Sequence, residues 1–248
     1  MNLLETQELT IRAGDRALMT GLNWNVNPGE FWCVLGRNGA GKSMLLHTLS
    51  GLRAADEGMV RLNGRGISQI PAIEQARLRG LMPQHIIDSF SCAVGEAVAI
   101  ALTPWRLGRS WDDQRDSETI RNALTRVGMS QRISDDITRL SGGERQRVEF
   151  AVMLVQNPAV MLFDEPTSHQ DVAQQLLLMR LMRQLSEEHA VVASCHDINL
   201  AARFATHVLL LGEDFNLAGL TSEMLTPDSL KSIFGCAFVR TGETFTAA

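Results

Sequence analysis

One stretch of this sequence decides its fold: Gly36-Arg37-Asn38-Gly39-Ala40-Gly41-Lys42-Ser43. The stretch matches the phosphate-loop pattern G-x-x-x-x-G-K-[ST] in full. An apolar run, residues 31–35, precedes it, and a segment with helical texture, residues 44–52, follows it. A strand, loop and helix of this kind gathers backbone N–H groups and the positive end of a helix dipole around a polyphosphate. The stretch therefore predicts binding of a nucleoside triphosphate, with Lys42 at the terminal phosphates and Ser43 on Mg²⁺.

The composition is that of an ordinary folded protein, and it limits the choice of partners. The 248 residues are 45% hydrophobic and 21% charged. A net charge of −5 offers no basic stripe to neutralise phosphates, which disfavours a nucleic-acid partner. Four scattered cysteines predict buried free thiols in a reducing compartment. The sequence shows no secretory signal and no apolar run approaching ~18 residues, so we expect partners to bring the chain to any membrane.

Two patterns of apolar residues, alternating and continuous, predict two kinds of strand. Residues 2–12 and 22–26 alternate polar and apolar side chains and predict an antiparallel hairpin, which a strand over 58–62 extends. Later runs are mostly apolar throughout, as in strands buried on both faces: residues 160–163, 190–194 and 207–211. Because helical segments separate these later strands, we predict an α/β core with a mostly parallel, doubly wound sheet.

The chain is predicted to be one domain of 248 residues assembled from four parts. We expect an antiparallel β subdomain, a nucleotide-binding core, an inserted helical subdomain and a C-terminal extension. The β subdomain comprises residues 1–30 and 54–70, and the nucleotide-binding core comprises residues 31–53, 71–84 and 148–211. The helical subdomain comprises residues 85–147, and the C-terminal extension comprises residues 212–248.

Two adjacent carboxylates follow the apolar run at residues 160–163. Asp164 and Glu165 are expected at the carboxyl end of a parallel strand, the edge where such sheets bind ligands. Asp164 is suited to coordinate Mg²⁺, and Glu165 to polarise the water that attacks the γ-phosphate. The pair predicts a nucleoside triphosphatase.

A second marker is Leu140-Ser141-Gly142-Gly143-Glu144-Arg145-Gln146-Arg147. Together with the phosphate loop and the acidic pair, this string resembles the signature of the ATP-binding cassette (ABC) ATPases, and the resemblance covers essentially the whole chain. It implies a P-loop NTPase (RecA-like) core with an N-terminal antiparallel β subdomain and an inserted α-helical subdomain. It also implies ATP and Mg²⁺ as cofactors, and a homodimer in which the signature of one subunit caps ATP on the phosphate loop of the other.

The resemblance assigns roles to single residues. Catalysis falls to four residues: Glu165, His196, Lys42 and Gln84. ATP binding falls to residues 36–43 and, from the partner subunit, to Ser141, Gly142, Gly143, Glu144 and Asp171. The implied metal ligands are Ser43, Gln84 and Asp164.

Two positions depart from the family pattern. Ala13 stands near the place where an aromatic residue usually stacks on adenine, and the chain has no tyrosine. Stacking of this kind is worth ~1–3 kcal/mol in nucleic-acid sites, so we expect weak ATP affinity and poor discrimination between bases. Gln170 replaces the leucine common in the loop before Asp171, and it is expected to alter the dimer seam.

Three further strings, residues 103–109, 196–203 and 225–235, resemble cassettes that serve importers of iron siderophores, haem and cobalamin. The resemblance implies membrane-spanning permease subunits that dock near residues 85–110, and indirectly a substrate-binding protein. It places the chain peripherally on the cytoplasmic face of the inner membrane, with cobalamin slightly preferred as cargo. A soluble ABC ATPase and an exporter cassette remain the alternatives. A scaffold that does not hydrolyse nucleotide is disfavoured, because Glu165 and His196 are both present.

Overall fold

A computed structural model describes residues 2–84, 90–106, 113–213 and 215–248. Its centre is a six-stranded sheet in which five strands run parallel and β10, at one edge, runs antiparallel to β9. In order across the sheet the strands are β10 (Asn216–Leu220), β9 (His207–Leu211), β3 (Phe31–Gly36), β8 (Ala190–Ser194), β7 (Val160–Phe163) and β6 (Arg79–Met82). The predicted α/β class and mostly parallel sheet are confirmed.

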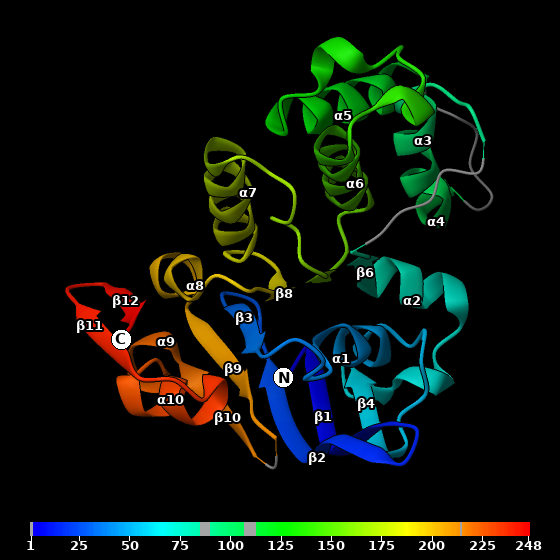
Figure 1. Ribbon diagram of the computed structural model, residues 1–248. Coiled ribbons are helices and arrows are strands. Elements are labelled where there is room, and N and C mark those ends of the chain that lie inside the picture. The colour runs from blue at the N-terminus through cyan, green and yellow to red at the C-terminus, as the bar shows by residue number, and fades with distance from the viewer. Residues whose placement is uncertain (1, 85–89, 107–112, 214) are drawn as a thin grey trace.

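A second, antiparallel sheet is formed by the N-terminal region. Its order is β2 (Arg16–Val26), β1 (Leu4–Ala13), β4 (Glu57–Leu62) and β5 (Arg65–Gly66). β1 and β2 form the predicted hairpin, although β2 begins at Arg16 rather than at residue 22. Figure 1 shows this sheet next to β3 and α1 (Lys42–Leu49), the elements that flank the phosphate loop.

Helices cover the sheet and form a separate lobe. Helices α3 (Val94–Ala99), α4 (Thr103–Arg106), α5 (Asp113–Arg126) and α6 (Gly142–Gln156) lie together, away from the N-terminal sheet (Figure 1). The other helices are α2 (Ala72–Leu78), α7 (Val172–Leu185), α8 (Ile198–Phe204), α9 (Thr221–Met224) and α10 (Pro227–Phe234). None of the helices in the described part of the chain is long and apolar enough to cross a membrane.

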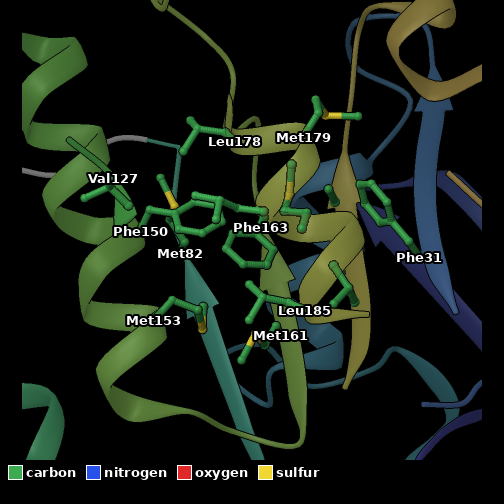
Figure 2. Close-up of a cluster of buried hydrophobic side chains, with 14 of the residues drawn as sticks. Phe31, Met82, Val127, Phe150, Met153, Met161, Phe163, Leu178, Met179 and Leu185 are labelled. Atoms are coloured by element: carbon green, nitrogen blue, oxygen red, sulfur yellow. The ribbon is translucent and has the colours of Figure 1, made fainter. Parts of the chain in front are cut away.

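The core lies on both faces of the central sheet, as the unbroken apolar runs predict. Along β3, Phe31 and Cys33 belong to one buried cluster, while Trp32 and Val34 belong to the cluster on the other face. The first cluster joins the sheet to α6 and α7 (Figure 2). Its centre is a stacked pair, Phe150 of α6 and Phe163 of β7, with ring centroids 4.9 Å apart. This packing holds the middle of α6 against the end of β7.

Some bounds differ from the sequence-based expectation. Helix α6 begins at Gly142, within the range 85–147 expected for the helical subdomain, and continues into the core segment expected from residue 148; Ser141 caps its first turn. The C-terminal region adds β10 to the sheet edge and forms a hairpin of β11 (Phe238–Thr241) and β12 (Thr244–Ala247). Neither the edge strand nor the hairpin was predicted, since weakly patterned strands of this kind depend on tertiary pairing.

Candidate nucleotide-binding and catalytic site

The phosphate loop connects β3 to α1 in the conformation that its glycines permit. Gly41 has φ 95° and Gly39 has φ 79°, backbone conformations that residues other than glycine rarely adopt. Lys42 as a residue is 6% exposed, and its ammonium donates hydrogen bonds to the carbonyls of Gly36, at 3.0 Å, and Arg37, at 3.3 Å. Burial lowers the pKa of Lys42, while the carboxylates of Glu165 and Asp164 oppose that shift. The loop therefore holds a partly desolvated cation close to two carboxylates.

A cavity of about 630 Å³ opens above this loop. Its size lies within the range for small-molecule sites. Its lining includes Gln84, Glu165 and His196, together with loop residues such as Lys42 and Ser43. It is also lined by Ala13, Arg16 and Leu18, and no Phe or Trp is among the described lining residues. Within this described lining, no such ring stands in for the aromatic residue that Ala13 lacks.

The acidic pair follows β7 and is held by the neighbouring strand β8. Ser194, the last residue of β8, donates from Oγ to Asp164 Oδ1 at 2.7 Å. The same Oγ accepts a hydrogen bond from the backbone N–H of Glu165 at 2.8 Å. Glu165 has φ 50°, a strained conformation that costs of order 1–3 kcal/mol in a residue other than glycine. Sequence reasoning missed Ser194, although its place at the end of an adjacent parallel strand is a signal that could have found it.

Three side chains converge on the Glu165 carboxylate. Gln84 Nε2 donates to Oε2 at 2.5 Å, and Ser168 Oγ donates to the same oxygen at 3.1 Å. His196 Nε2 contacts Oε1, and the side-chain exposures of this pair are 45% for His196 and 13% for Glu165. Gln84, Glu165 and His196 are distant in sequence, and the structure brings them together around one cavity.

The predicted metal ligands fit Mg²⁺ by their chemistry. Ser43, Gln84 and Asp164 offer hydroxyl, amide and carboxylate oxygens, the donors that this hard cation prefers. Asp164 uses Oδ1 to accept from Ser194, while the described residues place no donor on Oδ2. The described residues contain no cluster of three or more His, Cys, Asp or Glu suited to a metal. This mixed set accords with Mg²⁺, which is commonly held by one or two carboxylates together with substrate phosphates.

The Ser-Gly-Gly segment lies at the start of α6. Ser141 and Glu144 form a reciprocal cap: Ser141 Oγ accepts from the Glu144 N–H at 3.3 Å, and the Glu144 carboxylate accepts from the Ser141 N–H at 3.0 Å. The hydrogen bonds that the backbone N–H and the Oγ of Ser141 donate to the carboxylate lower the pKa of Glu144. Ser141 and Gly142 are exposed. None of residues 141–144 lines the cavity of its own chain.

Asp171 also lies outside this cavity and caps α7 by accepting from the Gln174 N–H at 2.9 Å. The predicted trans ligands are therefore separated from the predicted cis ligands within one chain.

A parallel sheet with a phosphate loop after β3 and an acidic pair after β7 defines a phosphate-loop nucleotide-binding protein. A family profile described as "ABC transporter" matches residues 19–168, well over half of the chain. The chain belongs to this ABC transporter family, as an ABC ATPase.

Several curated relatives align over 94% of this chain. It is 34% identical to the iron(3+)-hydroxamate import ATP-binding protein FhuC of Bacillus subtilis, covering 88% of that protein. It is 36% identical to the hemin import ATP-binding protein HmuV of Pseudomonas aeruginosa, covering 92%. It is 34% identical to the ferric enterobactin transport ATP-binding protein FepC of Escherichia coli, covering 87%.

Solved structures agree in fold. The structure of a metal-chelate type ABC transporter in an inward-facing conformation superposes with a TM-score of 0.82 at 25% identity, over 100% of this chain and 96% of that one. The dimeric cassette MJ0796 bound to ADP and Pi superposes with a TM-score of 0.78 at 23% identity, over 88% of this chain and 98% of that one. The latter comparison supports the cassette fold alone.

Proposed function

We propose that the chain hydrolyses ATP to power uptake of a metal chelate through a membrane importer, and that two copies close on ATP and reopen after hydrolysis. The observation that carries the proposal is the position of Glu165, which contacts Gln84 and His196 and lines the same cavity as the phosphate loop. The names of the relatives supply the transport context.

Each predicted residue has a role within this proposal. Residues 36–43 and the Lys42 ammonium hold the phosphates, and Ser43, Gln84 and Asp164 would hold Mg²⁺. When bound, Mg²⁺ neutralises charge on the phosphate oxygens. Glu165 orients the attacking water, and His196 lies within reach of the terminal phosphate. Phosphoryl transfer depends mainly on positioning and charge neutralisation, and these groups can supply both.

The partner subunit completes the site in this proposal. Residues Ser141, Gly142 and Gly143, with Glu144 and Asp171 nearby, cap the nucleotide of the opposing copy. Their separation from their own cavity supports a trans role. Because the terminal phosphate then touches both copies, its presence favours the closed dimer and its loss favours the open one.

An apolar groove in the helical lobe is the proposed docking site for the membrane-spanning permease. It has a volume of about 710 Å³, and its lining includes Phe90, 83% exposed, and Ile100, 69% exposed. Exposed apolar surface of this kind marks interaction sites. Of the predicted docking range 85–110, residues 85–89 and 107–110 lie outside the described residues. The proposed location is peripheral, on the cytoplasmic face of the cell membrane.

For the cargo, we propose an iron chelate, either a siderophore complex or haem. The relatives reported above are named for iron(3+)-hydroxamate, hemin and ferric enterobactin. The slight preference for cobalamin drawn from sequence resemblance receives no support from these names. The substrate-binding protein of such an importer is a further proposed partner.

The test is reconstitution of the chain with candidate permease subunits in vesicles, with uptake of ferric siderophore, haem and cobalamin measured separately. We expect ATP-dependent uptake of one iron chelate, and loss of both uptake and complex formation with Ile100→Glu. Leu52→Glu is the matched control, since Leu52 is also 69% exposed but lies outside the groove. ATP hydrolysis that no permease stimulates would favour a soluble ATPase, and ATP-driven efflux would favour an exporter.

A further inference from the structure

Gln170, the residue that departs from the family leucine, makes three hydrogen bonds to the beginning of α6. Its Nε2 donates to the carbonyl of Gly143 at 2.9 Å and to Oε1 of Gln146 at 2.9 Å. Its Oε1 accepts from Nη1 of Arg147 at 3.3 Å. The loop that follows β7 is thereby joined to the signature segment of the same chain.

Gln146 extends this connection to the catalytic carboxylate residue. The Gln146 side chain is buried, with the residue 7% exposed, and its Nε2 donates to the backbone carbonyl of Glu165 at 2.9 Å. Glu165 is the residue with the strained φ of 50°, so its backbone needs support from its surroundings. The Gln146 carboxamide thus bonds to the Glu165 backbone through Nε2 and to the Gln170 side chain through Oε1.

The two segments are also in close steric contact. A Cβ built on Gly143 would lie 3.3 Å from both polar atoms of the Gln170 carboxamide and 3.3 Å from the carbonyl oxygen of His169. A leucine at position 170 could fill similar space but could not donate hydrogen bonds. The Gly143 carbonyl and Gln146 Oε1 would then lose the donor that Gln170 supplies.

From this geometry we propose that Gln170 is a positioning residue that, through Gln146, fixes the glycine turn of the signature relative to Glu165 of the same subunit. The inference rests on the proposed function, in which that turn contacts the nucleotide of the partner subunit. When the glycine turn closes on the nucleotide of the partner subunit, it then also positions the Glu165 backbone at the nucleotide of its own subunit. The two sites of the dimer are therefore coupled.

The test compares Gln170→Leu with Gln175→Leu in the full chain. Gln175 is the matched control because its Nε2 bonds to the Thr167 carbonyl of the same loop at 3.3 Å and not to α6. We expect Gln170→Leu to lower kcat about tenfold, as loss of the three hydrogen bonds of the Gln170 side chain implies. The Kd of the isolated subunit for ATP and the unfolding temperature should match those of the control, because the phosphate loop and core are untouched.

Two further measurements distinguish a positioning role of Gln170 from a general loss of structure in the variant. Amide hydrogen exchange over residues 144–146, whose N–H groups are bonded, should become about fivefold faster in Gln170→Leu, with or without ATP hydrolysis. The double variant Gln170→Leu with Gln146→Leu should lose no more activity than Gln146→Leu alone, because the two residues act in series.

Multiplicative losses, or exchange equal to that of the control, would overturn the inference and leave the proposed function standing. A wild-type chain that hydrolyses no ATP would instead overturn the proposed function, while the exchange measurement would still decide whether Gln170 holds the turn.

Discussion

Replacing Glu165 by glutamine is the sharpest perturbation of the proposed catalytic step. Both carboxylate oxygens are occupied by side chains, Oε1 by His196 and Oε2 by Gln84 and Ser168. Glutamine has the same shape but carries no negative charge and can accept no proton. Glu165→Gln therefore removes the ability to polarise water while leaving the volume of the site unchanged.

The expected loss follows from the role of the carboxylate. A positioned general base contributes about 10²–10⁴-fold to rate, which corresponds to roughly 3–5 kcal/mol of barrier. Binding of ATP should be preserved, since residues 36–43 are untouched. It should tighten slightly, because a carboxylate close enough to oppose the burial-driven fall in the pKa of Lys42 also repels the phosphates. The ATP-bound dimer should accumulate, because the step that opens it is slowed.

The measurements are phosphate release at saturating ATP, ATP affinity by calorimetry, and size-exclusion chromatography with ATP and Mg²⁺. Glu188→Gln is the matched control, since Glu188 is exposed in the turn between α7 and β8. We expect turnover at least a hundredfold below this control, together with a new dimer peak. Turnover of Glu165→Gln within a few-fold of the control would refute the assignment of Glu165.

Four further changes test other parts of the site and core. Lys42→Ala should abolish measurable nucleotide binding in a titration, because it removes the buried cation of the phosphate loop. Ser141→Arg should leave ATP binding to one subunit intact but prevent ATP-driven dimers, which chromatography with a slowly hydrolysed analogue would detect. Ala13→Tyr should tighten ATP by about tenfold, as ~1–3 kcal/mol of stacking implies, while a strong ATP preference over GTP in the parent chain would contradict the weak base discrimination expected here. Phe163→Ala should lower the free energy of unfolding by about 3–5 kcal/mol in urea titrations, because it removes the ring stacked on Phe150.

The sequence predicts the central strands well because their environment is uniform. Strands β3 and β7 are buried along their whole length, and unbroken apolar runs are the direct consequence of that burial. The phosphate loop and the acidic pair are equally visible, since their chemistry requires fixed residue types at fixed spacing. Gln84 and His196 were predicted through the family resemblance.

Other features depend on contacts between segments that lie far apart in the chain. Ser194 supports Asp164 and Glu165 only because β7 and β8 end side by side, and its place at the end of a predicted strand is the one sequence signal of that function. The start of α6 at Gly142 depends on its cap, because glycine disfavours helices and the Ser141 cap outweighs that preference.

The distribution of charge within one chain argues for a composite site. The cavity presents the Lys42 ammonium to the nucleotide, but Asp164 and Glu165 lie close by and oppose the charge of a triphosphate. Mg²⁺ offsets part of this repulsion, and the charge that remains on the terminal phosphate requires further hydrogen-bond donors. The exposed start of α6 has free backbone N–H groups and the positive end of a helix dipole, yet it lies outside its own cavity. A second copy placed with its Gly142 over the first nucleotide would supply those donors, so we expect ATP itself to drive dimer formation. Dimers that form equally well without nucleotide would contradict this reasoning.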